Sequence, residues 1–103
     1  MDPWKTLQEE VCELFNQYPG FTATEEEVVE GARSSVQVDV LVRYQFWELD
    51  HVIVVECKAW QKRVTQEKVF ALKAIVDDLG AQFGIIVSPK GLQAGADKFR
   101  VLV

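Results

Sequence analysis

The chain has 103 residues, of which 49% are hydrophobic and 26% are charged. This composition is typical of a globular domain and excludes a disordered or collagen-like chain. Residues 1–103 are enough to bury one core, so a single domain is expected. No apolar run reaches the ~18 residues that a membrane span needs, and the first residues lack the basic and then apolar pattern of a secretory signal. We therefore expect a cytoplasmic protein without membrane contact.

The net charge of −5 disfavours a polyanionic ligand, but the charge is distributed unevenly. The first 30 residues hold eight acids and one base, Lys5, whereas residues 57–76 hold five bases and one acid, Glu67. These five bases are Lys58, Lys62, Arg63, Lys68 and Lys73. A local basic surface for DNA is therefore compatible with an acidic chain. The alternative is that these charges belong to ordinary solvated faces.

The first predicted element is a helix over residues 3–18. Asp2 is suited to cap it, Pro3 to occupy its first position, and its apolar residues recur at helical spacing. Residues 24–30 then indicate an acidic strand, and residues 31–34 supply turn-forming side chains.

Two hydrophobic strands follow this turn. Residues 36–43 alternate valine with other side chains at a period of two, and residues 51–58 form a β-branched run that indicates a strand buried on both faces. A hairpin connection would place these two strands side by side.

The last third of the chain indicates a crossover. A helix capped by Thr65 and ending at Gly80 leads to a strand over residues 82–88, which predicts parallel pairing with the preceding strand. Residues 91–100 predict a third helix, and residues 101–103 begin a short edge strand. The expected fold class is α/β (α+β), in the order α-β-β-β-α-β-α-(β), with a mixed sheet flanked by helices.

Three charged residues stand in or beside the apolar strands. Asp39 interrupts the valine-rich strand, while Glu56 and Lys58 end the most hydrophobic one and share a face of the sheet. Paired carboxylates suit Mg²⁺, which polarises phosphate groups, and a nearby lysine would assist phosphodiester hydrolysis. The alternative is a surface Glu–Lys pair and an unrelated aspartate.

The order Asp39, then Glu56-Cys57-Lys58, resembles the D…ExK motif of the PD-(D/E)xK nuclease superfamily. Together with residues 84–88 and 91–96, it is similar to the Mrr-like (type IV restriction endonuclease-like) catalytic domain. This resemblance implies a restriction-endonuclease-like core and a Mg²⁺-dependent DNA endonuclease, a deoxyribonuclease in which Mn²⁺ substitutes for Mg²⁺.

The resemblance also implies roles for individual residues. Asp39, Glu56 and the backbone carbonyl of Cys57 would bind the metal, and Lys58 would act on the attacking water. Two accessory residues are implied as well, Gln66 at the start of the second helix and Glu10 on the first; both have the alternative of being exposed helix residues. The residues expected to contact DNA are Lys62, Arg63, Lys68 and Lys90.

The sequence departs from the family pattern in two ways. Val38 occupies the position of the proline in the motif's name, and 103 residues leave no room for a separate DNA-recognition domain. Targeting would then depend on a homodimer, to which Trp47, Trp60 or Phe99 would contribute, or on a separate DNA-targeting partner. Two alternatives stay open: a structure-specific nuclease similar to Holliday junction resolvases, and an inactive nuclease fold that binds nucleic acid or protein.

Overall fold

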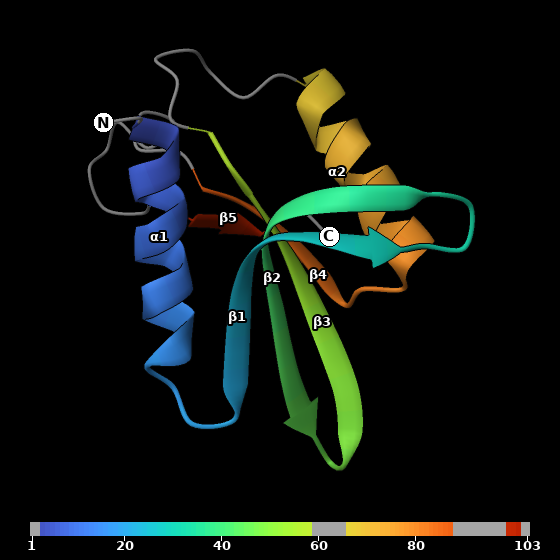
Figure 1. Ribbon diagram of the computed structural model, residues 1–103. Coiled ribbons are helices and arrows are strands. Elements are labelled where there is room, and N and C mark those ends of the chain that lie inside the picture. Colours follow the sequence, from blue (N-terminus) through green and yellow to red (C-terminus); the bar gives the residue numbers. More distant parts are fainter. Residues whose placement is uncertain (1–2, 59–65, 88–98, 102–103) are drawn as a thin grey trace.

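The computed structural model describes residues 3–58, 66–87 and 99–101 (Figure 1). Its helices and strands are α1 (Pro3–Asn16), β1 (Phe21–Glu30), β2 (Ser35–Phe46), β3 (Leu49–Cys57), α2 (Gln66–Leu79), β4 (Phe83–Val87) and β5 (Phe99–Val101). Neither helix in this part of the chain has the length and apolar character needed to cross a membrane.

The five strands form one mixed sheet in the order β1-β2-β3-β4-β5. β3 and β4 pair in parallel and are connected through α2, whereas the other neighbours are antiparallel. The hairpin and the parallel crossover predicted from the sequence are therefore confirmed, as is the mixed α/β class.

The C-terminal end of the chain differs in part from the prediction. Most of the expected third helix, residues 91–100, lies outside the described residues. Its last two residues, Phe99 and Arg100, are not helical, because they pair with Val87 and Ile86 in an antiparallel edge strand. The pairing satisfies backbone groups along the edge of β4 that would otherwise lack a strand partner.

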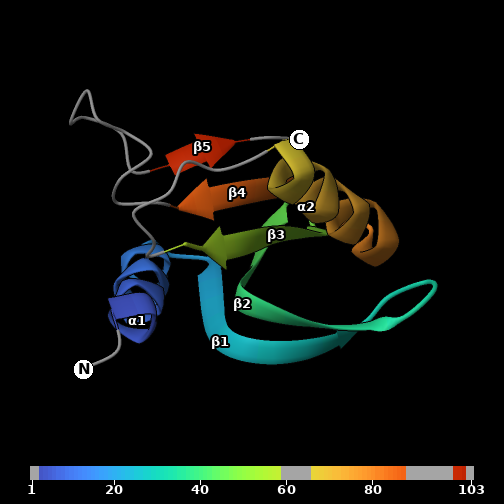
Figure 2. The same cartoon turned by 90° about the horizontal axis from the view of Figure 1, so that it is seen from above.

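Two helices cover opposite faces of the sheet, each with its own hydrophobic core (Figure 2). On one face, Leu7 and Val11 of α1 pack with alternate residues of the central strands. On the other face, Leu72 and Val76 of α2 pack on the intervening residues. Gly84 permits close contact with α2, since a Cβ atom there would lie 2.7 Å from a methyl group of Val76. The central strands are thus buried on both faces, as their continuous apolar sequence predicts.

The β1–β2 hairpin bends sharply halfway along its length (Figure 2). Glu26 has a φ of 50°, in the left-handed region that non-glycine residues rarely adopt. The neighbouring pairs, Glu25 with Val40 and Glu27 with Val38, place Glu26 across from Asp39. Beyond the bend, the outer half of the hairpin packs Val29, Val36 and Val38 in the core beneath α2.

The hairpin turn, residues 31–34, is fastened to the end of α2 by Asp78. The Asp78 carboxylate accepts hydrogen bonds from the backbone N–H of Arg33 at 2.8 Å and from its Nε at 3.2 Å, and the Asp78 carbonyl accepts one from Ala32 at 3.0 Å. Gly31 allows this approach, because a Cβ atom there would lie 2.2 Å from an Asp78 oxygen. We call this set of contacts the Asp78 latch.

The Asp78 latch makes stability depend on pH in a defined direction. Burial opposes ionisation of Asp78, whose side chain is 7% exposed, but the hydrogen bonds and charge of Arg33 outweigh burial and lower the pKa of Asp78 below its ordinary value. A lowered folded-state pKa stabilises the fold above the unfolded pKa of about 3.9, and this contribution disappears as the pH falls through the lower folded pKa. At pH 7, Asp78→Asn should therefore unfold at a lower temperature than the wild type. In strong acid, where Asp78 is protonated, the difference between the two midpoints should disappear. Asp77→Asn, an exposed neighbour, is the control; an equal deficit at both pH values would contradict the prediction.

Candidate active site

Asp39 lies where β2 separates from β3. The two strands pair from Val40 to Phe46, with Val40 opposite Val55. If the ladder continued, Cys57 would face Val38, but the hairpin bend carries β2 away toward α2. The N–H of Cys57 instead donates to Oδ2 of Asp39 at 2.9 Å. The side chain of Asp39 thus takes the place of a backbone acceptor, which fixes its carboxylate beside the end of β3.

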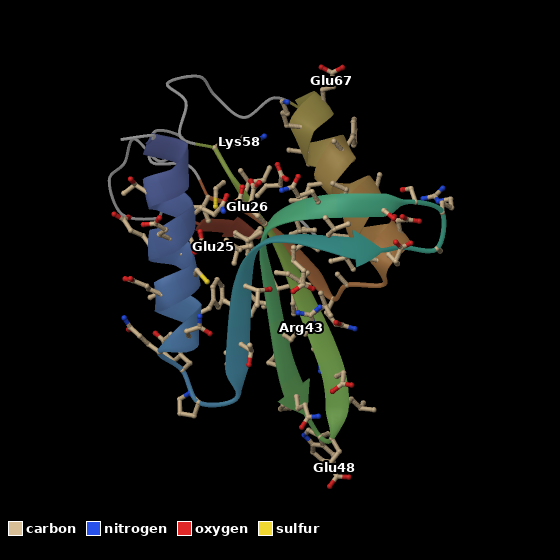
Figure 3. All side chains as sticks on the ribbon, viewed as in Figure 1. Glu25, Glu26, Arg43, Glu48, Lys58 and Glu67 are labelled. Carbon is tan, nitrogen blue, oxygen red and sulfur yellow. The ribbon has the colours of Figure 1, made fainter. Side chains whose placement is uncertain are left out.

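Glu56 and Lys58 complete the cluster at this end of β3. Nζ of Lys58 lies 3.2 Å from Oε2 of Glu56, and each side chain is 22% exposed. The backbone N–H of Lys58 donates to the carbonyl of Val87 at 2.9 Å, which holds the strand end against β4. Figure 3 shows Lys58 at the end of β3 and Glu67 on the first turn of α2, on the same side of the molecule.

The charge of Asp39 acts on the carboxyl group of Glu56. Burial raises the pKa of Glu56 above its ordinary value, and the negative charge of Asp39 raises it further. The positive charges of Lys58 and Lys68 act in the opposite direction and do not fully compensate. Burial is the main obstacle to ionisation of Glu56, and a cation bound beside its carboxylate would favour the ionised form.

This donor set fits a hard divalent cation. Among the described residues, no group of three His, Cys, Asp or Glu side chains forms a metal cage. Mg²⁺ does not need one, because it is usually held by one or two carboxylates and keeps several waters. Asp39 uses Oδ2 for the Cys57 N–H, so its Oδ1 is available as a ligand. The carbonyl of Cys57 stays a predicted ligand.

The thiol of Cys57 is not suited to act as a nucleophile. Its residue is 1% exposed and packs in the core beneath α1, on the face opposite the intervening residues of β3. Burial, followed by the charges of Asp39 and Glu56, raises the pKa of the Cys57 thiol to about 12. The thiol therefore stays protonated and acts as a packing group.

On α1, the inward polar residue is Gln8, which the sequence analysis missed. Gln8 is fully buried, and its Nε2 donates to Oε1 of Glu25 at 3.2 Å. Its Oε1 is buried without a hydrogen-bond partner in the described part of the chain. Glu10, the expected residue of this helix, lies on the exposed side instead. The signal was present, since Gln8 follows Trp4 by four residues and precedes Val11 by three, within the apolar stripe.

The remaining predicted residues are only partly described. Gln66 is the first residue of α2, as expected, but its side chain lies outside the described residues, as do Lys62, Arg63 and Lys90. Lys68 is exposed on the first turns of α2, and its charge reaches Glu56. The structure thus brings together Asp39, Glu56 and Lys58, with Lys68 nearby, and leaves the other roles as predictions.

The similarity of this chain to a known family extends over nearly its whole length. The family model Mrr_cat, described as restriction endonuclease, matches residues 1–101. The chain belongs to this restriction endonuclease family. A comparison with curated proteins gave no match.

The fold of this Mrr_cat domain is also similar to a solved structure. The crystal structure of a protein of unknown function, AF1548, superposes with a TM-score of 0.66 at 16% sequence identity. The match covers 84% of this chain and 47% of that one, so the Mrr_cat domain spans about half the length of AF1548. At this identity the similarity supports the fold alone.

Two substitutions separate the structural role of Asp39 from its predicted ligand role. Asp39→Ala leaves the buried N–H of Cys57 without its acceptor and should lower the free energy of unfolding by about 1–3 kcal/mol. Asp39→Asn keeps an acceptor oxygen and should stay close to the wild-type stability, yet lose Mn²⁺ binding. Denaturant unfolding and calorimetric Mn²⁺ titration measure the two effects. If Asp39→Asn bound Mn²⁺ as tightly as the wild type, Asp39 would have a structural role only.

Proposed function

We propose that the protein is a Mg²⁺-dependent endonuclease that hydrolyses phosphodiester bonds in DNA in the cytoplasm. The observation that carries this proposal is the convergence of Asp39, Glu56 and Lys58 at the end of β3, in a chain of the restriction endonuclease family. Two carboxylates and an ammonium group are the chemistry that metal-assisted phosphodiester hydrolysis requires.

In this mechanism, Asp39, Glu56 and the carbonyl of Cys57 hold the cation, and Mn²⁺ substitutes for Mg²⁺. A bound divalent cation supplies polarisation of the phosphate and a lowered pKa of water. Lys58 orients the attacking water and stabilises the negative charge that develops on the phosphate oxygens. Water adds to phosphorus and the bond to the 3′ oxygen breaks, which leaves a 5′-phosphate and a 3′-hydroxyl.

The DNA backbone would be held by Lys62, Arg63, Lys68 and Lys90. The exposed position of Lys68 and the effect of its charge on Glu56 support this placement for α2. Cleavage of both strands needs two sites, so the active form is a homodimer, and a separate partner supplies any targeting. Gln66 and Glu10 remain accessory candidates of this mechanism. Gln8 is a further candidate on α1, because its Oε1 is buried and has no hydrogen-bond partner among the described residues.

The proposed activity is tested by nicking of supercoiled plasmid and of a branched junction. The wild type should nick in Mg²⁺ or Mn²⁺ and stop in EDTA. Asp39→Ala and Lys58→Ala should lower the nicking rate by at least about 100-fold, because each removes a group that acts on the reacting phosphate or its cation.

The matched controls are Asp50→Ala and Lys73→Ala, which remove exposed charges of the same types at the start of β3 and on α2. Both should nick like the wild type. Equal nicking by all variants would identify a contaminant and overturn the assignment. Cleavage confined to the junction would favour a resolvase-like enzyme, and DNA binding without any nicking would favour an inactive module.

The DNA contacts predict a steep dependence on salt. Each phosphate contact that is lost should reduce the slope of log affinity against log salt by about 0.9. Lys68→Ala should therefore flatten the slope by about that amount, as measured by fluorescence anisotropy on duplex DNA in EDTA, whereas Lys73→Ala should not. The same slope for Lys68→Ala and the wild type would remove Lys68 from the interface.

A further inference from the structure

Asp39 lies next to the outer half of the β1–β2 hairpin, whose two strand segments pair with each other but not with β3. β2 pairs with β3 only from Val40 onward, so beyond Asp39 the outer half of the hairpin is joined to the molecule by its valines and by the turn. This outer half comprises residues 27–30 and 35–38, a paired segment about 13 Å long at the usual rise per residue. A short, hydrogen-bonded ribbon of this length is stiff.

The far end of this ribbon is the Asp78 latch. The turn is closed by a hydrogen bond from the N–H of Gly31 to the carbonyl of Ser34 at 2.8 Å. The amides of Ala32 and Arg33 donate to the backbone carbonyl and to the carboxylate of Asp78, respectively. The near end is the bend, where Glu26 is held at a positive φ across from Asp39. A backbone conformation of this kind costs free energy of order 1–3 kcal/mol and persists only when the surrounding contacts enforce it.

We infer that Asp78 is a positioning residue for the active site, which acts through the hairpin: the latch holds the bend that presents the Asp39 carboxylate to the end of β3. The inference deepens the proposed function and rests on it only for the ligand role of Asp39. Removal of the latch frees the ribbon to straighten at Glu26, which draws Asp39 away from the N–H of Cys57. The carboxylate of Asp39 would then be displaced from the active site, although no residue of the site itself has been substituted.

Amide hydrogen exchange tests this coupling at single residues. In Asp78→Ala, the amide of Arg33 loses its acceptor and should exchange faster, whereas the amide of Ala32 keeps the backbone carbonyl of residue 78 as its acceptor. The decisive amide is that of Cys57, which should exchange roughly fivefold or more faster, the lower end of typical couplings between distant sites. The amide of Lys58 is the internal control: it donates to Val87 of β4 and should be unchanged.

Two further variants keep the result interpretable. Asp77→Ala removes the neighbouring exposed acid and should leave the Cys57 amide as in the wild type. Arg33→Ala removes only the side-chain contact to Asp78 and should give an intermediate effect. Unchanged exchange of the central amides of Val54 and Val55 shows that each variant is folded. In a folded Asp78→Ala with fast exchange at Arg33, an unchanged Cys57 amide would overturn the inference.

Calorimetric Mn²⁺ titration adds a second readout. If the inference holds, Asp78→Ala should weaken Mn²⁺ binding by roughly fivefold or more, and Asp78→Asn, which retains an acceptor oxygen, should recover part of the loss. The proposed function and the positioning role of Asp78 are contradicted by different results. Absence of Mn²⁺ binding in the wild type would contradict the proposed function, whereas the Cys57 amide still decides the role of Asp78 because it is measured without metal.

Discussion

The hydrogen bond from the N–H of Cys57 to the carboxylate of Asp39 is the contact on which the rest of the site depends. In an unbroken antiparallel ladder that N–H would find a backbone acceptor on β2, and no side chain would be needed. Because β2 bends away after Val40, the exposed strand end needs another acceptor. The same geometry that satisfies the backbone therefore brings a carboxylate beside Glu56 and Lys58.

This arrangement places the carboxylates of Asp39 and Glu56 close together at a partly buried strand end. Glu56 is partly buried and its pKa is raised by burial and by Asp39, while Lys58, at 3.2 Å, compensates in part. In the absence of a cation, Lys58 is held by Glu56 as its counter-ion. A cation that Asp39 and Glu56 would hold, as proposed above, would take over that compensation, and the ammonium group of Lys58 would then interact with a phosphate.

Much of this fold could be predicted from the sequence, because the spacing of hydrophobic residues indicates which side of a helix or strand is buried. The strands around Asp39 and Glu56 and the helix after Thr65 were predicted close to their observed bounds. The inward polar side chain of α1 was not predicted. The family resemblance implied an acidic residue on this helix, and Glu10 is the acid nearest the apolar stripe, whereas the buried polar residue is Gln8. The bend at Glu26 was not predicted, because a glutamate rarely adopts a positive φ. The hydrogen bonds that Glu27 accepts from Thr24 and Arg43 beside the bend form only in the folded hairpin.

Contacts that are distant in sequence explain why a short motif is not sufficient to specify the site. The sequence separation of Asp39 and Glu56 is compatible with an ordinary hairpin. In a regular antiparallel ladder, the two side chains would be ordinary cross-strand neighbours. Their use as a pair requires that β2 leave β3 at Asp39. That separation requires the outer hairpin to be held elsewhere, by the valines over the core beneath α2 and by Asp78 at its turn. If Asp78 positions Asp39 as we infer, the proposed active site depends on a contact at the opposite end of the hairpin, which residue spacing along the chain does not encode.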